Sequence, residues 1–318
     1  MVAARSIDPI RSALYVPANK PAWLASAADH EADVVILDLE DAVAPSAKAE
    51  AREHVTEHAP ELTAAGQRVY VRINGHANAT HDHTAADIEA ALAAGVEGLV
   101  LPDVTEAADI TATATVLDHI ERREGRPVGE TTLMPIIETA AGMRAAHAVC
   151  AASERVRTVE CGAVKGADTE RALGFEWTGP GASGLETVHL LEKVLMDARA
   201  AGVEYPLSGP YVDIEDIEGL RADMQFAREV GYDGYVVIHP DHVAHANDIY
   251  LPDAEMVEYW IGAYNALQTA RETGDSAVRY EGEMIDTAML DTARRYLRVA
   301  RAFESELDLD IEIPAIDG

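Results

Sequence analysis

Acidic side chains follow two neighbouring apolar runs of this sequence. Glu138 comes directly after the run Leu133–Ile137, and Asp168 follows the run Val156–Cys161 after a short loop. Two carboxylates from adjacent strand ends, with several positions left for water, suit a hard octahedral cation such as Mg²⁺. Mn²⁺ accepts similar oxygen ligands and is the alternative metal. Such a cation can chelate an α-keto acid and polarise its carbonyl, so Glu138 and Asp168 are the candidate metal ligands.

A second acidic cluster, Asp38-Leu39-Glu40-Asp41, follows the apolar run Val34–Leu37. Helix capping and solvation account for one or two of these carboxylates. Three together repel one another, and the crowding becomes favourable when a cation or its bound water lies nearby. The cluster therefore favours a cation, or water bound to it, near this strand end.

Arg72 ends the apolar run Val69–Val71 and is followed closely by Asn74. A buried arginine is costly unless an anion or a carboxylate pairs with it. Two interpretations stand side by side: an internal ion pair with the acidic cluster at residues 38–41, and a substrate-binding role. Both can hold at once.

Eight apolar runs of this kind alternate with stretches of helical spacing, such as Ala85–Ala94 and Leu185–Ala201. Repeated strand–helix units predict an α/β protein with a closed (β/α)8 TIM barrel, whose active site gathers at the carboxyl ends of the strands. The polar residues that end the runs should therefore converge on one mouth. The predicted strands are Ser12–Val16, Val34–Leu37, Val69–Val71, Gly98–Leu101, Leu133–Ile137, Val156–Cys161, Tyr205–Ser208 and Tyr235–Ile238.

The barrel is expected to occupy residues 8–250 and to be followed by a C-terminal helical arm over residues 251–304. Asp253 is the expected N-cap of the first arm helix. A break at residues 274–282 precedes a second helix, and the acidic tail, residues 305–318, should fray. Each helix carries an apolar stripe, which predicts packing on a neighbouring subunit. The stripes are Met256, Tyr259, Trp260, Ala263, Tyr264 and Leu267, then Met289, Leu290, Ala293, Tyr296, Leu297 and Ala300.

The charge balance is strongly acidic. The 318 residues include 56 Asp and Glu against 25 Lys and Arg, of which only 4 are lysine, and the net charge is −31. Acid spread over a well-patterned chain favours a halophilic protein, because in molar salt the Debye length is about 3 Å and self-repulsion is screened. An ordinary acidic protein is the alternative.

Several function classes are disfavoured. No basic face can be assembled for a nucleic acid. The apolar runs are too short for a membrane span, and the start MVAARSIDPI lacks a secretory apolar region, so a cytoplasmic protein away from membranes is expected. Cys150 and Cys161 form neither a disulfide framework nor a zinc site and should be inert packing residues.

Two patterns imitate binding motifs. The glycines of residues 179–184 match a dinucleotide fingerprint, but no apolar strand precedes them and Pro180 interrupts them, so a mobile loop over the mouth is expected. His76, His81 and His83 lie in a polar stretch without regular spacing, which favours a solvated loop over a metal site.

Several of these stretches resemble the family of malyl-CoA lyases and citrate lyase beta subunits. The resemblance runs in order along nearly the whole chain and reaches into the arm. The stretches that carry it are Arg11–Lys20, Val35–Val43, Val71–Asn74, Pro135–Thr139, Gly209–Asp213, Ile238–Pro240 and Gly282–Asp286.

The resemblance implies a barrel that assembles as a homotrimer or as a hexamer of trimers. It implies Mg²⁺ on Glu138 and Asp168, and keto-acid and thioester oxygens on Arg72. Glu40 and Asp41 would hold metal-bound water, and Asp286 would be the acid/base, delivered by the arm across a subunit boundary. The residues assigned to substrate and coenzyme A in this way are Pro17, Asn19, Lys20, Ile238 and His239.

The chain departs from the family pattern at two points. In the sixth loop Val164 and Lys165 lengthen a motif that is usually compact, and Asp168 is aligned by its distance from Leu173 and Gly174. After Leu101-Pro102 the family usually has lysine, whereas here Asp103 removes a positive charge near the mouth.

The expected activity is reversible cleavage of a 3-hydroxyacyl-CoA, malyl-CoA or β-methylmalyl-CoA, to glyoxylate and acetyl-CoA or propionyl-CoA. One alternative at the same site is a malyl-CoA thioesterase or malate-synthase-like reaction, and another is citryl-CoA lyase activity. The third is a non-catalytic acyl-CoA-binding subunit, motivated by Asp103 and the altered sixth loop.

Overall fold

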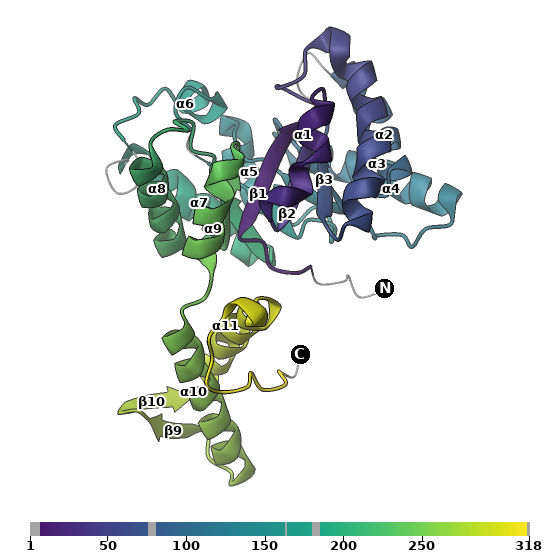
Figure 1. The fold of residues 1–318 in the computed structure, drawn as a ribbon. Coiled ribbons are helices and arrows are strands. Elements are labelled where there is room, and N and C mark those ends of the chain that lie inside the picture. The colour runs from purple at the N-terminus through teal and green to yellow at the C-terminus, as the bar shows by residue number, and fades with distance from the viewer. Residues whose placement is uncertain (1–6, 76–80, 163, 180–184, 317–318) are drawn as a thin grey trace. The chain divides into compact units, whose positions relative to one another are not determined.

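The computed structural model describes residues 7–75, 81–162, 164–179 and 185–316. The chain divides into two compact units, Met1–Tyr250 and Leu251–Gly318. The first unit contains eight parallel strands, β1 to β8, surrounded by helices (Figure 1). The strands are β1 Ser12–Pro17, β2 Val34–Asp38, β3 Arg68–Arg72, β4 Gly98–Leu101, β5 Thr132–Pro135, β6 Thr158–Glu160, β7 Tyr205–Ser208 and β8 Gly234–Val237.

The strand order β5-β4-β3-β2-β1-β8-β7-β6 leaves β5 and β6 at the two ends of the sheet. These two strands meet through parallel bridges between Leu133 and Val156 and between Ile136 and Glu160. The eight-stranded α/β barrel is therefore confirmed, and each strand lies within two residues of its predicted bounds. The helices around it are α1 Pro21–Ala25, α2 Lys48–Ala64, α3 Thr84–Ala93, α4 Ala107–Glu124, α5 Ala140–Cys150, α6 Asp168–Leu173, α7 Leu185–Ala200, α8 Ile217–Val230 and α9 Val243–Tyr250.

Side chains alternate between the two faces of each strand, which divides the core into two layers. On β2, Val35 and Leu37 pack outward under the helices, whereas Val34 and Ile36 belong to a separate cluster inside the barrel. Because the period is two, the strand's last residue, Asp38, shares the interior face. The same alternation turns the last residues of several other strands inward.

The second unit contains α10 Ala254–Glu272, β9 Ala277–Tyr280, β10 Glu283–Asp286 and α11 Leu290–Ala302. Asp253 is the N-cap of α10, because its side chain accepts the Met256 backbone N–H. The two predicted stripes form the core of this unit, although Met256 is exposed. Packing of these helices on a neighbouring subunit remains a prediction.

One expectation for the second unit is confirmed and one is wrong. The break expected at residues 274–282 separates α10 from α11, and it holds an antiparallel hairpin that was not expected, with Tyr280 paired to Glu283 around the two-residue turn Glu281-Gly282. Both turn residues have positive φ, as a type I′ turn requires. The tail does not fray up to residue 316: Ile313 is buried in the core, and the Arg301 guanidinium donates to its carbonyl.

No helix in the described part of the chain is long and apolar enough to cross a membrane. Cys150 and Cys161 are buried, as expected of packing residues, and burial raises the pKa of each thiol to about 12. The glycine-rich stretch after Gly179 and the side chains of His76 and His81 lie outside the described residues.

Candidate active site

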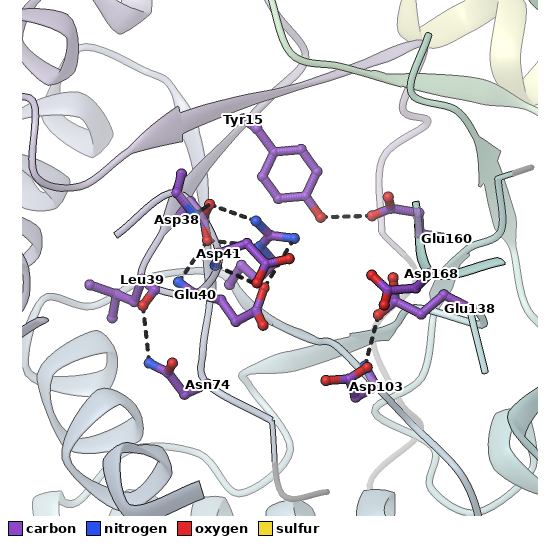
Figure 2. A network of polar contacts seen from close by, with 12 residues as sticks. Tyr15, Asp38, Leu39, Glu40, Asp41, Asn74, Asp103, Glu138, Glu160 and Asp168 are labelled. Carbon is purple, nitrogen blue, oxygen red and sulfur yellow. Dashed lines mark hydrogen bonds and ion pairs between the residues drawn. The ribbon is translucent and has the colours of Figure 1, made fainter. Parts of the chain in front are cut away.

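Interior-facing residues at or near the ends of four strands line one pocket at the carboxyl end of the barrel. Tyr15 comes from β1, Asp38 from β2, Arg72 from β3 and Glu160 from β6. Together with Glu138, which follows β5, they surround a cavity of about 250 Å³. Figure 2 shows Tyr15 turned toward Glu160, with Asp38 and Glu138 on opposite sides of the pocket. Because side chains alternate between the two faces of each strand, polar residues at the strand ends converge on one mouth, as predicted.

Arg72 holds Asp38 through two parallel hydrogen bonds. Its Nε donates to Oδ1 at 2.7 Å and its Nη2 to Oδ2 at 2.6 Å, while Nη1 lies 3.4 Å from the Glu40 carboxylate. Burial alone would raise the pKa of Asp38, but the charge and hydrogen bonds of Arg72 outweigh it and lower that pKa. The Tyr15 ring packs against the Arg72 guanidinium, with the ring centroid 4.8 Å from the guanidinium carbon. The internal ion pair is therefore confirmed.

The backbone of the acidic cluster is held from behind by buried donors. Lys48, which is 2% exposed, donates from Nζ to the carbonyls of Leu39 and Glu40, both at 2.9 Å. The Asn74 amide donates to the Leu39 carbonyl at 3.0 Å, and Asp87 accepts both the side-chain and the backbone N–H of Asn74. These contacts link α2 and the residues after β3 to the loop, and they fix Glu40 beside Arg72.

Across the pocket lie carboxyl groups with raised pKa values. Burial is the main cause: it raises the pKa of Glu138 to about 8 and that of Glu160 to about 7. The Glu160 charge raises the Glu138 value further, while the Asp103 backbone N–H, 2.8 Å from Glu138 Oε1, opposes the rise. Figure 2 shows Glu138, Glu160 and Asp168 on the side of the pocket opposite Asp38.

This carboxyl set fits a hard divalent cation. A buried carboxyl group that resists ionisation, such as Glu138, gains stability when a positive charge is placed beside it. Among the described residues, no three His, Cys, Asp or Glu side chains converge closely enough to enclose a metal. Mg²⁺ does not require such an enclosure, because it usually keeps several waters and takes one or two carboxylates.

Asp168 is the first residue of α6 and lines the cavity, with 26% of its side chain exposed. It also pairs with Arg171 one turn later on the same helix. Of the two residues that lengthen the sixth loop, Val164 lines the cavity and Lys165 is exposed outside it.

The other predicted site residues fall into three groups. Pro17, Asp41 and Ile238 line the cavity together with Arg72, Glu138 and Asp168. Glu40, Asn19, Lys20 and His239 are outside that lining; Glu40 is buried beside Arg72, and Lys20 is exposed at the start of α1. Asp286 belongs to the second unit, where it is exposed at the end of β10 and its Oδ1 accepts the Ala288 backbone N–H.

Sequence reasoning missed Tyr15 and Glu160 as site residues. The Tyr15 hydroxyl donates to Glu160 Oε2 at 2.8 Å, and both side chains line the cavity. The strand period could have found them, because each lies two residues beyond an interior position of its own strand. For Glu160, the sequence signal of a site residue is a carboxylate at an interior-facing position of an apolar strand.

A closed barrel of eight parallel strands, with an acidic pocket and one guanidinium at their carboxyl ends, defines an α/β-barrel enzyme. The chain matches the model of the HpcH/HpaI aldolase/citrate lyase family over residues 11–240. It belongs to that family, and it is an enzyme of the lyase class.

Relatives and solved structures of the same kind cover nearly the whole chain. The chain is 31% identical to an L-malyl-CoA/beta-methylmalyl-CoA lyase of Cereibacter sphaeroides, over 92% of its length and 95% of the relative's. It is 32% identical to a (3S)-malyl-CoA thioesterase of the same species, over 94% and 97%. The structure resembles the protein CitE from Mycobacterium tuberculosis in complex with magnesium, acetoacetate and coenzyme A, with a TM-score of 0.68, 30% identity, and coverage of 95% and 100%.

Proposed function

We propose that the protein catalyses the reversible, Mg²⁺-dependent cleavage of a 3-hydroxyacyl-CoA, malyl-CoA or β-methylmalyl-CoA. The products are glyoxylate and acetyl-CoA or propionyl-CoA. The observation that carries the proposal is the cavity of about 250 Å³ whose lining includes Arg72, Glu138 and Asp168. Support comes from the malyl-CoA lyase relative and from the solved neighbour that contains magnesium, acetoacetate and coenzyme A.

Glu138 and Asp168 are the residues that would hold Mg²⁺, with Mn²⁺ as the alternative. Bound there, the metal supplies Lewis-acid polarisation of the hydroxyl and carboxylate of the glyoxylate half. Glu138 is kept in place by the Asp103 backbone N–H, and Asp168 by its position at the start of α6.

In the cleavage direction the bond between C2 and C3 of the substrate breaks. The 3-hydroxyl proton passes to water held by Glu40 and Asp41, and the C–C electron pair moves to the thioester as an enolate. Burial raises the pKa of Glu40 to about 7, with Arg72 opposing and the Asp41 charge adding to the rise, and a group near pH 7 suits this proton transfer. Arg72 stabilises the charge that develops on the thioester oxygen.

Asp286 then protonates C2 of the enolate, and it removes the same proton in condensation. Its carboxylate is exposed at the end of β10 in the second unit, and one of its oxygens accepts the Ala288 backbone N–H. We propose that the arm brings it to the pocket of a neighbouring subunit in a trimer or a hexamer.

Coenzyme A would lie along the mouth near the ends of β1 and β8, which are hydrogen-bonded neighbours. Pro17, Asn19 and Lys20 follow from β1, and Ile238 and His239 follow from β8. The exposed ammonium of Lys20 suits the phosphates of the cofactor, since it keeps its three donors at the surface.

The decisive experiment is an assay of malyl-CoA, β-methylmalyl-CoA and citryl-CoA with and without Mg²⁺, in about 3 M KCl, where surface charge is screened. Glyoxylate and free coenzyme A are followed separately. We expect Mg²⁺-dependent glyoxylate release without free coenzyme A. Failure of every thioester to release an oxo acid would refute the lyase proposal.

A second candidate is hydrolysis of malyl-CoA, favoured by the 32% identity to a malyl-CoA thioesterase. It uses the same pocket and differs in whether water reaches the thioester carbonyl. Free coenzyme A and malate, with no glyoxylate, would identify this activity. Titration with acyl-CoA that shows binding but no turnover would instead indicate a non-catalytic subunit.

A further inference from the structure

Glu160 is a buried carboxylate that the proposed reaction leaves without a role. It is the last residue of β6, is 4% exposed and lines the cavity. Its backbone is held on both sides, because its carbonyl accepts the Ile137 N–H at 2.8 Å and its other neighbour in the sheet is Leu207 on β7. The residue therefore cannot leave the cavity wall without opening the barrel.

Its side chain is also fixed. The Tyr15 hydroxyl donates to Glu160 Oε2 at 2.8 Å, and the Tyr15 ring lies against the Arg72 guanidinium at 4.8 Å. Tyr15 is thus held at both its ring and its hydroxyl, and Glu160 presents its carboxylate to the cavity in one orientation (Figure 2).

The charges around the cavity are unequal. Among the described residues that line it, Arg72 is the one arginine or lysine, against the carboxylates of Asp38, Asp41, Glu138, Glu160 and Asp168. Two of the nitrogens of Arg72 already donate to Asp38. A metal on Glu138 and Asp168 would coordinate one carboxylate of a substrate, but the described residues of the lining offer no further cation for a second.

We propose that Glu160 restricts the enzyme to substrates whose released 2-oxo acid carries a single carboxylate, as glyoxylate does. This inference rests on the proposed function and names its substrate class. A citryl-type substrate, which releases the dicarboxylic oxaloacetate, would bury its distal carboxylate beside Glu160. A buried like charge with no partner is strongly unfavourable, so the residue acts by exclusion.

The test uses Glu160→Gln, which keeps the volume and an acceptor for Tyr15 and removes only the charge. Dissociation constants of glyoxylate, oxaloacetate and 2-oxosuccinamate are measured by calorimetry at pH 8.5 with saturating Mg²⁺, along with kcat/KM for malyl-CoA and citryl-CoA.

In the natural protein we expect 2-oxosuccinamate, which has a neutral amide in place of the distal carboxylate, to bind at least about tenfold tighter than oxaloacetate. In Glu160→Gln, oxaloacetate binding and the citryl-CoA to malyl-CoA ratio should each rise about tenfold or more, with glyoxylate affinity nearly unchanged.

Glu57→Gln is the matched control, since it makes the same change on the exposed face of α2 and should alter no ratio. Equal binding of oxaloacetate and 2-oxosuccinamate by the natural protein overturns the proposal, and this measurement needs no variant. The proposal is also overturned if Glu160→Gln weakens the binding of Mg²⁺ and of both oxo acids to the same extent, because Glu160 would then be a metal ligand. If no thioester is cleaved, the lyase proposal fails by itself, while the oxo-acid binding data still decide the role of Glu160.

Discussion

At the scale of single residues, the chemistry depends on a guanidinium with two tasks. Arg72 neutralises Asp38 and faces the cavity. Arg72→Ala should lower kcat by about 10²–10³-fold or more, because a preorganised donor to the enolate oxygen is lost. Arg72→Lys keeps the charge but cannot form the two parallel bonds to Asp38, so it should recover only part of the rate. Steady-state kinetics measure both, and circular dichroism checks that each variant is folded. Near natural rates in Arg72→Ala would remove the residue from the mechanism.

Residue chemistry was the most predictable part of the site. Arg72 with its acidic partners could be expected from the cost of burying an unpaired charge, and the ion pair exists. Tyr15 and Glu160 were not predicted, because each sits inside an apolar run that reads as ordinary core. The strand period places each residue on the interior face, but only the closed barrel brings the two side chains into contact.

At the scale of elements, helix α2 positions the acidic loop through Lys48. Lys48→Met removes the charged donor to the carbonyls of Leu39 and Glu40 while keeping the apolar stem. The Leu39 carbonyl keeps the Asn74 amide and the Glu40 carbonyl keeps the Val43 backbone N–H, so each lost hydrogen bond should cost about 1.5–3 kcal/mol, and kcat should fall more than KM rises as the loop shifts. Lys193→Met makes the same change at the partly exposed ion pair with Asp197 on α7 and should cost about 1 kcal/mol or less. Equal effects of the two variants on kcat would contradict this role for Lys48.

The end of α4 is tied to the barrel by a buried ion pair. Arg155, just before β6, donates to both oxygens of Glu121, which also accepts the backbone N–H groups of Gly129 and Thr131. Burial would raise the pKa of Glu121, but these hydrogen bonds outweigh it and lower that pKa. Glu121→Gln removes one of the two carboxylates that pair with Arg155, leaving Asp118 at 2.6 Å, and should cost about 1–3 kcal/mol of unfolding free energy.

The sign of the pH dependence follows from the lowered pKa. Below the unfolded-state pKa of about 4.3, the unfolded chain binds a proton that the folded chain still refuses, so the stabilisation by Glu121 is lost as the pH falls through its folded pKa. Denaturant unfolding at pH 7 and at pH 4 should therefore show a smaller difference between the natural protein and Glu121→Gln at the lower pH. A constant or growing difference would exclude the linkage.

Elements with a strong hydrophobic period were predictable from the sequence. Elements that depend on contacts with distant residues were not. The hairpin of β9 and β10 rests on a Glu281-Gly282 turn that lacks the usual Asn-Gly signature. The tail looked disordered from its acidity, yet Ile313 finds a buried place and Asp310 donates its backbone N–H to Glu258. Both outcomes depend on contacts far apart in the sequence.

At the scale of the whole molecule, the net charge of −31 sets the dependence on salt. Raising KCl from 0.1 M to 3 M shortens the Debye length from about 10 Å to below about 3 Å and screens the repulsion among carboxylates. We expect the Tm to rise steeply over this range. Sucrose at matched osmolality serves as the uncharged control and should raise it less. A Tm independent of KCl would argue against a halophilic protein.

Assembly decides whether the site is complete, since the proposed acid/base Asp286 belongs to the second unit. Arg72→Ala and Asp286→Asn should each be nearly inactive alone. When the two variants are co-expressed at equal levels, a ring in which each arm serves the next pocket restores about a quarter of the natural activity, because half of the pockets keep Arg72 and half of their neighbours keep Asp286. Separately purified variants that cannot exchange subunits are the control. If the mixed oligomer is no more active than either parent, Asp286 does not act across the subunit boundary, and its role as the proton donor must then be sought within one chain.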